Sequence, residues 1–330
     1  MMLDPGSEVF AANRAVGHLT LSVKFAEGAT RRAHVREQGP LRLRCPGPPA
    51  RELEGVIVNT SGGMAGGDRF ELDMTVGPQA RLLVTSAAAE KVYRTLDTES
   101  TIAAGLRVEA GGELTWLPQE TILFDRARLR RSIEVDLAAD ARLILVEAVV
   151  FGRSGMGETV AEGLLLDRRR VRRQGRLLHA ETLRLEGDVA AKLGQGAIAN
   201  GGAAVASILT VPGDDATITA AREAGQHCRG EIGASAWNGL AVIRLVAPHG
   251  AELRHDLAQV LAAVRTAPQP RLWLQLGKAC KTAKVCHEPH SPGKGQASHR
   301  DGGNGGAPAA RARRQAQPSG GGGARHRFHP

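Results

Sequence analysis

Residues 72–84 read LDMTVGPQARLLV, residues 106–117 read LRVEAGGELTWL and residues 133–146 read IEVDLAADARLILV. Each stretch has an alternating apolar pattern, a turn rich in small residues and a second apolar run, which together indicate strand, turn and strand. Equivalent leucines stand at Leu82, Leu114 and Leu143, 32 and 29 residues apart. Such spacings are typical of stacked repeats in which each unit covers its neighbour. The repeat therefore predicts a mainly β fold, a β-helix-like stack of short strands.

An antiparallel sandwich is the alternative fold, because its strands also recur at short spacing with turns between them. About two α-helices are expected beside the strands. One covers residues 215–228, with Asp214 or Asp215 as its cap. The other covers residues 251–267 and ends at Pro268; its apolar face consists of Leu253, Leu257, Val260, Leu261 and Val264.

A glycine-rich loop, Asn59–Asp68 (NTSGGMAGGD), precedes the first repeat and lies between two predicted strands. We call it the first glycine loop. Glycine permits positive φ and close backbone approach, so the loop first suggests a phosphate cradle. However, no lysine and no strong helix pattern follow it. We interpret its glycines as allowing close packing in the stack, with Asp68 near a cation path or a partner surface.

The second glycine loop, residues 152–159 (GRSGMGET), follows an apolar strand as a Walker A loop would. Glu158 stands where that motif requires lysine, and a carboxylate there opposes a phosphate. A hydrolase elbow would need glycine in place of Met156. The pattern therefore favours a simple glycine turn leaving a strand.

The formal net charge of +9 is unevenly distributed: residues 278–330 carry ten Lys/Arg and two acids, which leaves +1 on the rest. The composition of this segment cannot bury enough apolar surface to order itself. We expect a flexible N-terminus (1–16), one β domain (17–276) and a disordered basic tail (277–330). The tail's metal-capable side chains, Cys280, Cys286, His287 and His290, fit no standard zinc spacing.

Four cysteines without a dense framework indicate a reducing compartment, and we expect a cytoplasmic protein. No signal-peptide pattern begins the chain, and no apolar run reaches about 18 residues, so no membrane segment is expected. Arg168–Arg173 with Arg176 form a basic run without interleaved aromatic residues. This run favours a solvated strand edge or a protein-docking face over a specific nucleic-acid site.

Carboxylates gather near both glycine loops. Asp68 closes the first, Glu147 precedes the second and Glu158 lies inside it, while Glu90 and Glu120 stand between them. Carboxylates bind hard or borderline cations weakly and reversibly. They also cap turns or pair with arginine and lysine. The clustering keeps a metal-transit hypothesis open.

A set of ordered motifs carries a family resemblance: residues 39–42 (GPLR), 61–68 (SGGMAGGD), Thr85 with 89–94 (AEKVYR), 116–124 (WLPQETILF), 151–153 (FGR) with 157–158 (GE), 233–235 (GAS) and 270–273 (PRLW). In this order, over residues 17–275, the sequence resembles the urease accessory protein UreD family, called UreH in some organisms. The resemblance implies a β-helix-like fold with a couple of helices. The sequence departs from the family pattern at Thr60, where proline is common, and at Ala87, where glutamine or proline is frequent. It also departs in residues 277–330, which are an addition or a frame-shifted read-through.

The resemblance also implies a function. Members of that family are not enzymes; they dock on urease apoprotein and on UreF, which recruits the GTPase UreG, and the assembly passes nickel into urease. Asp68, Glu147 and Glu181 fall where members place acids beside a proposed internal nickel route, and Glu158 fits the shared Gly-Glu. It implies nickel in transit, no tightly bound cofactor and a homodimeric arrangement within the complex. Two alternatives remain: a hydrolase-like enzyme using the glycine-loop carboxylates, and a nucleic-acid binder using the basic tail.

Overall fold

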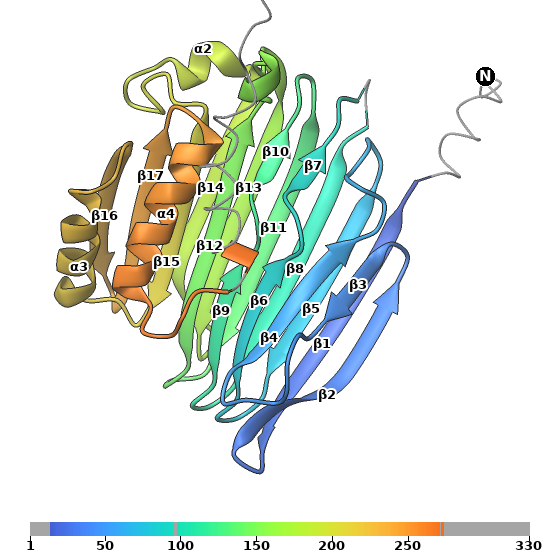
Figure 1. Cartoon of the computed structure of the whole chain (residues 1–330), viewed down its shortest axis with the longest axis vertical. Coiled ribbons are helices and arrows are strands. Elements are labelled where there is room, and N and C mark those ends of the chain that lie inside the picture. The colour runs from blue at the N-terminus through green and yellow to red at the C-terminus, as the bar shows by residue number, and fades with distance from the viewer. Residues whose placement is uncertain (1–13, 96–97, 271, 274–330) are drawn as a thin grey trace, which may run out of the picture. The chain divides into compact units, whose positions relative to one another are not determined.

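The computed structural model describes residues 14–95, 98–270 and 272–273 (Figure 1). Within these ranges the chain is mainly β, with two sheets, three α-helices and one 3₁₀ turn. Most of the predicted flexible N-terminus lies outside the described residues. So does the whole predicted tail, with its Cys280, Cys286, His287 and His290.

Sheet A consists of β1 (Val16–Ala26), β2 (Ala29–Gln38), β5 (Arg69–Val76), β8 (Ser100–Val108), β11 (Arg128–Leu137), β13 (Glu162–Arg173) and β14 (Arg176–Asp188). Their order across the sheet is β14, β13, β11, β8, β5, β1, β2. The apolar and polar residues alternate along most of these strands, so each strand buries one face.

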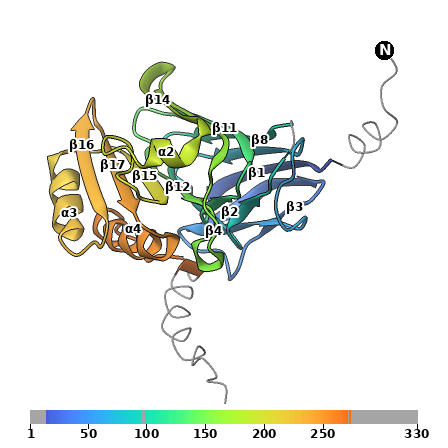
Figure 2. The ribbon, with the colours of Figure 1, turned by 90° about the horizontal axis from the view of Figure 1, so that it is seen from above.

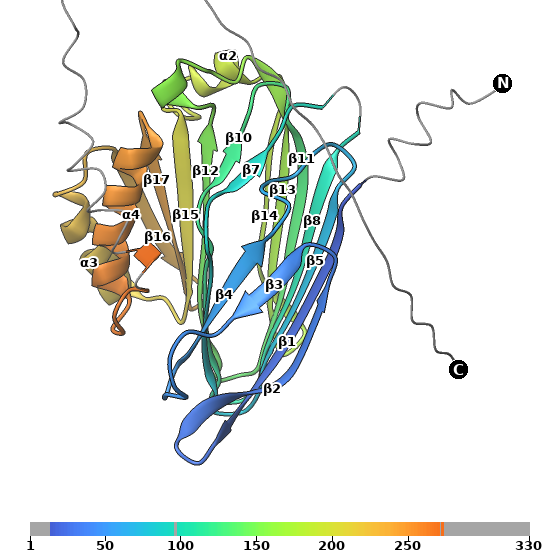
Figure 3. The ribbon, with the colours of Figure 1, turned by 45° about the vertical axis from the view of Figure 1, so that its right-hand side comes forward.

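Sheet B consists of β3 (Leu41–Arg44), β4 (Leu53–Asn59), β6 (Arg81–Ser86), β7 (Glu90–Val92), β9 (Glu113–Leu117), β10 (Thr121–Leu123), β12 (Arg142–Phe151), β15 (Ala204–Val211), β16 (Glu231–Trp237) and β17 (Leu240–Ala247). Its main order is β16, β17, β15, β12, β9, β6, β4, β3, while β10 pairs with β12 and β7. Figure 3 shows sheets A and B as two facing layers.

The chain coils between the two sheets from β4 to β13, and each of these strands pairs in parallel with its counterpart in the next repeat. Leu114 pairs with Leu82 on one side and with Leu143 on the other. The β-helix-like stack is therefore confirmed, in the register that the leucines predicted. Antiparallel pairs occur toward the ends of the stack, where β2, β3, β14 and the β15–β17 group extend the sheets.

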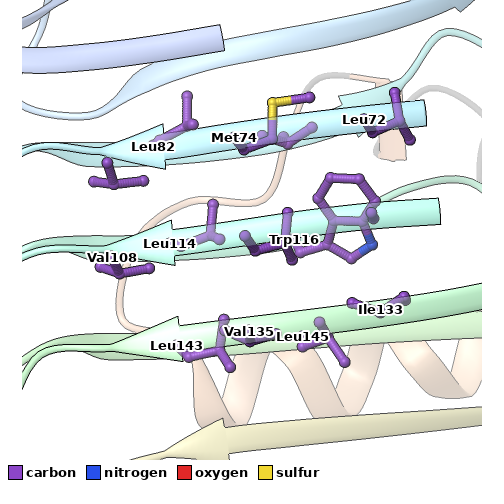
Figure 4. Packing of buried hydrophobic residues seen from close by; sticks show 14 of the residues in the cluster. Leu72, Met74, Leu82, Val108, Leu114, Trp116, Ile133, Val135, Leu143 and Leu145 are labelled. Atoms are coloured by element: carbon purple, nitrogen blue, oxygen red, sulfur yellow. The ribbon is translucent and has the colours of Figure 1, made fainter. Parts of the chain in front are cut away.

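The main hydrophobic core fills the space between the sheets. Figure 4 shows how side chains of successive repeats stack there; Leu82, Leu114 and Leu143 hold equivalent positions on neighbouring strands. The turns at the end opposite the glycine loops are also joined, because Gln79 N donates to Ala110 O at 2.9 Å and Gly111 N donates to Asp140 Oδ1 at 2.9 Å.

Both predicted helices are present, as α3 (Asp215–Gly225) and α4 (Gly250–Val264). Asp214 caps α3, accepting a 2.9 Å hydrogen bond from Thr217 N. Figure 2 shows α4 beside β15 and β17 of sheet B. Its residues Leu253, Leu257, Val260 and Leu261 are buried there in a second apolar cluster. A third helix, α2 (Val189–Leu193), was not predicted, because five residues are too short to show a helical period.

Candidate functional site

Four charged side chains interrupt the apolar core between the sheets: Arg131 of β11, Glu147 of β12, and Asp167 and Arg169 of β13, all at most 7% exposed. The period-two alternation of each strand places them inward. Asp167 follows the buried Leu165 two positions later, and Glu147 likewise follows Leu145. We call these four residues the buried charged cluster.

Asp167 lies at the centre of this cluster. Its Oδ2 accepts hydrogen bonds from Arg131 Nη2 at 2.6 Å and from Arg169 Nη2 at 2.7 Å. Burial alone would raise the pKa of Asp167, but the two guanidiniums hold it well below its usual range. Asp167 is therefore ionised at neutral pH and holds both arginines in place.

Glu147 is held differently. It pairs with Arg131, and its Oε1 accepts a 2.7 Å hydrogen bond from Trp116 Nε1. Burial raises the pKa of Glu147; the charge of Arg131 opposes the rise and that of Asp167 adds to it. Of the two carboxyl groups in the cluster, that of Glu147 therefore holds a proton more tightly.

A cavity of about 430 Å³ adjoins the cluster and is lined by Glu147, Arg169 and, from β14, Glu181. Its remaining lining is largely apolar and includes Val149, Leu185, Leu193 and Val205. The Arg169 guanidinium spans the two sheets by donating to Ser207 Oγ of β15. The cavity therefore lies between the sheets, with charged groups on one side and aliphatic side chains on the other.

Glu181 lies at the more exposed side of this cavity, with its side chain 22% exposed. Its Oε1 accepts a 2.7 Å hydrogen bond from Arg244 Nη2, and its Oε2 is 3.7 Å from His179 Nε2. His179 first, and then Arg244, lower the pKa of Glu181 to about 2. Glu181 is therefore a carboxylate throughout the physiological pH range.

The structure brings two of the four predicted site residues together. Glu147 and Glu181 line the same cavity. Asp68 instead organises the first glycine loop, where its two oxygens accept backbone hydrogen bonds from Ala15 N at 2.8 Å and Ala65 N at 2.7 Å. Glu158 lies in the second glycine loop and accepts a 2.6 Å hydrogen bond from Arg153 Nε.

The second glycine loop is a turn between two strands. Gly152 follows β12 with φ +82°, and a Cβ there would lie 2.4 Å from Glu158 O. A short 3₁₀ turn (Ser154–Met156) follows, and then β13 rather than an α-helix. The interpretation of this loop as a glycine turn, and not a Walker A loop, is confirmed.

Sequence reasoning missed the arginines of the site. Arg169 was placed in a solvated basic run, yet it is 7% exposed and points into the cluster, while Arg168 on the same strand is exposed. The signal was present, because Asp167, Arg169 and Val171 continue the inward phase of Leu165. Arg131 of β11 and Arg244 of β17 were likewise not connected with the carboxylates.

Within residues 14–95, 98–270 and 272–273, no three or more His, Cys, Asp or Glu side chains are grouped so as to hold a metal ion. The carboxylates of the cavity are instead paired with guanidiniums. A cation could bind there only by displacing an arginine from its carboxylate, which makes tight binding unfavourable. In the same described ranges, no helix is both long and apolar enough to cross a membrane.

Comparison with known proteins gives a consistent match. The family described as "UreD urease accessory protein" matches residues 15–274. A urease accessory protein UreD of Rhodopseudomonas palustris (strain BisA53) is 52% identical over 268 residues, which cover 81% of this chain and 93% of that protein. A urease accessory protein UreD 3 of Bradyrhizobium sp. (strain BTAi1) is 50% identical over 277 residues, 83% of this chain and all of that protein.

Proposed function

Because the chain belongs to the UreD family of urease accessory proteins, we propose that it docks on urease apoprotein with UreF and UreG and assists nickel insertion. A role in urease maturation follows from the family. The docking partners, the dimeric arrangement and the passage of nickel are the proposal. In it, the protein works in the cytoplasm without catalytic turnover, and nickel is its cargo rather than a resident cofactor.

The cavity between the sheets is the observation that carries this proposal. It holds two carboxylates at different depths, since Glu147 is 4% exposed and the Glu181 side chain is 22% exposed. Carboxylate oxygens bind divalent cations, and two carboxylates in one cavity can bind the same ion one after the other. In this proposal Glu181 receives the ion and Glu147 binds it further in.

The charge balance of this region suits transit better than storage. Each carboxylate has an arginine partner: Arg244 for Glu181, and Arg131 for Glu147. A nickel ion can bind either carboxylate only if the arginine paired with that carboxylate moves away. The favourable free energy of nickel binding is therefore small, and the ion can dissociate again. Asp68 and Glu158, with oxygens engaged in the glycine loops, have supporting rather than direct roles in this proposal.

A gene deletion complemented with variants tests the proposal. Without the gene, urease apoprotein should accumulate without nickel. The double variant Glu147→Gln/Glu181→Gln should still capture UreF but give urease with low nickel content. Glu134→Gln is the matched control, because Glu134 also pairs with arginines, Arg170 and Arg172, but on the outer face of sheet A. Full nickel occupancy of urease in the deletion strain would rule the function out.

The two alternative functions have less support. An accessory-protein family argues against the hydrolase-like alternative, and a substrate screen of the purified protein tests it. The nucleic-acid alternative depends on the basic tail, which lies outside the described residues. Truncation after Leu276 should remove any polyanion binding, and such binding should weaken with salt.

A further inference from the structure

The two glycine loops are joined through aromatic side chains. Tyr93 Oη donates a 2.9 Å hydrogen bond to Gly62 O of the first glycine loop. The Tyr93 ring contacts Phe124 edge-on, with 5.1 Å between ring centroids. Phe124 in turn lies under the guanidinium of Arg153 in the second glycine loop, 4.2 Å from the ring centre. The loops are therefore parts of one surface at the same end of the stack.

This surface contains a cleft of about 460 Å³. It is lined by two aromatic residues, three arginines and two acids: Tyr93, Phe124, Arg94, Arg126, Arg153, Asp125 and Glu158. Because the rings are fixed against the loops and against each other, the arginines around them are presented by a rigid support. We call this feature the arginine cleft.

The acids of the arginine cleft are already engaged. Asp125 Oδ1 accepts backbone hydrogen bonds from Ala161 N at 2.8 Å and Glu162 N at 3.2 Å, which fixes the start of β13. Glu158 is bound to Arg153 at 2.6 Å. Glu158 is therefore committed to Arg153, and only Oδ2 of Asp125 is left to face a further guanidinium.

The other two guanidiniums of the cleft, those of Arg94 and Arg126, are weakly paired. Arg126 is 69% exposed, and its Nε is 3.9 Å from Asp125 Oδ2. Arg94 is exposed; its backbone forms a bridge with Ala127, but its side chain makes no hydrogen bond or ion pair with any residue that the structure describes. The arginine cleft thus offers two guanidiniums that can still donate hydrogen bonds to a carboxylate.

We propose that the arginine cleft docks an acidic segment of a partner protein, with a carboxylate between Arg94 and Arg126. An apolar side chain of the same segment packs on Met156, which is 75% exposed and whose sulfur lies 3.6 Å from Arg153 Nη1. Arginine, tyrosine and methionine around a rigid pocket are the residues enriched at protein interfaces.

Other occupants fit the arginine cleft less well. The chain's own C-terminal segment, residues 278–330, carries +8 and is repelled by it. A second copy meeting the same surface would set arginine against arginine. Nucleic acid is acidic, but the cleft's two rings meet edge-on and are fixed by the loops, so they offer no stacking platform.

The inference rests on the proposed function for the identity of the partners, so the full-length chain is assayed with purified UreF, UreG and urease apoprotein. In Arg94→Glu/Arg126→Glu, the affinity for one of them should fall at least about tenfold at physiological salt. The control, Arg36→Glu/Arg107→Glu, reverses two exposed arginines of sheet A and should bind like the wild type.

The outcomes separate the two proposals. If the wild-type chain binds none of the three proteins, the proposed function fails. If it binds them and the cleft variant binds all of them equally well, or if the control variant loses as much affinity, the arginine cleft is not a docking site. If a single-stranded oligonucleotide or inorganic phosphate binds the wild type but not the cleft variant, while both bind the partner proteins equally well, the cleft is assigned to that anion instead.

Discussion

Trp116 Nε1 donates a 2.7 Å hydrogen bond to Glu147 Oε1 inside the space between the two sheets. The two residues belong to neighbouring parallel strands, β9 and β12. The indole gives the buried carboxylate a neutral donor, and Arg131 gives it a charged one. Two donors therefore stabilise the Glu147 carboxylate, and only one of them is charged. Arg131 can be replaced by a cation while the hydrogen bond from Trp116 remains.

Trp116→Phe tests the strength of this hydrogen bond. The substitution removes the donor and leaves a carboxylate oxygen unsatisfied in the core, so the free energy of unfolding should fall by about 2–3 kcal/mol. Urea-induced unfolding measures the loss. Trp273→Phe is the control, because Trp273 is equally buried but donates to the neutral Thr85 Oγ1 over 3.3 Å. Equal losses in both variants would assign the effect to ring volume alone.

Asp167→Asn should be among the most destabilising substitutions in the chain. It leaves Arg131 and Arg169 buried without their shared carboxylate, at a cost of about 3–5 kcal/mol at neutral pH. Because the native pKa of Asp167 is depressed, its contribution is present above the unfolded pKa of about 3.9 and is lost as pH falls through the native value.

The pH dependence of the free energy of unfolding tests this role of Asp167. Unfolding measured from pH 6 to the acid limit of solubility should show wild-type stability converging toward that of Asp167→Asn at the lowest pH. The exposed Asp136→Asn on the outer side of β11 is the control and should run parallel to the wild type. A constant gap between the wild type and Asp167→Asn across the acid range would contradict the assigned role.

The repeat architecture could be predicted from the sequence because it depends on the spacing of apolar residues. Leu82, Leu114 and Leu143 recur at nearly constant spacing, and the same three residues pair across parallel strands. The antiparallel strands at the ends of the stack follow no such period. Residues 29–38 (ATRRAHVREQ), for example, form the polar strand β2. Their apolar and polar residues do not alternate regularly, so the sequence did not identify this strand.

Only the carboxylates of the candidate site could be predicted from the sequence. Glu147 was singled out by its position before the second glycine loop and by the family resemblance, and Glu181 by the resemblance alone. The structure places both on one cavity. Their arginine partners were not found, because Arg169 stands in a run of arginines where charge suggests solvent exposure. Charge and strand phase gave opposite predictions at this position, and the phase was correct.

Glu90→Gln should make the protein more stable at neutral pH. Burial first raises the pKa of Glu90 to about 7, with the hydrogen bond from Asn59 opposing and the charge of Asp68 adding. A raised carboxyl pKa means that the native state holds the proton more tightly. Stability is therefore fully present below the unfolded pKa of about 4.3 and falls by about 3 kcal/mol as pH rises to about 7.

Glutamine mimics the protonated acid and can still accept from Asn59 Nδ2, which is 3.0 Å from Glu90 Oε1. The free energy of unfolding of Glu90→Gln should therefore decline less than that of the wild type between about pH 4.5 and 7. Urea titrations at half-unit pH steps measure both curves. Glu99→Gln, at a carboxylate whose pKa Arg130 lowers, should retain the wild-type decline. A decline preserved in Glu90→Gln would exclude Glu90 as its source.

Gly63→Ala should damage the first glycine loop far more than Gly62→Ala. Both glycines have positive φ, +147° at Gly63 and +76° at Gly62. A Cβ at Gly63 would lie 2.6 Å from Tyr93 Cε2 and 2.9 Å from Lys91 O, whereas a Cβ at Gly62 meets nothing within 4 Å. Gly62→Ala should therefore cost only the backbone strain of about 1 kcal/mol, and Gly63→Ala roughly 3 kcal/mol, because it also displaces the tyrosine. Thermal unfolding compares them, and equal losses would show that the loop and Tyr93 are not packed as one unit.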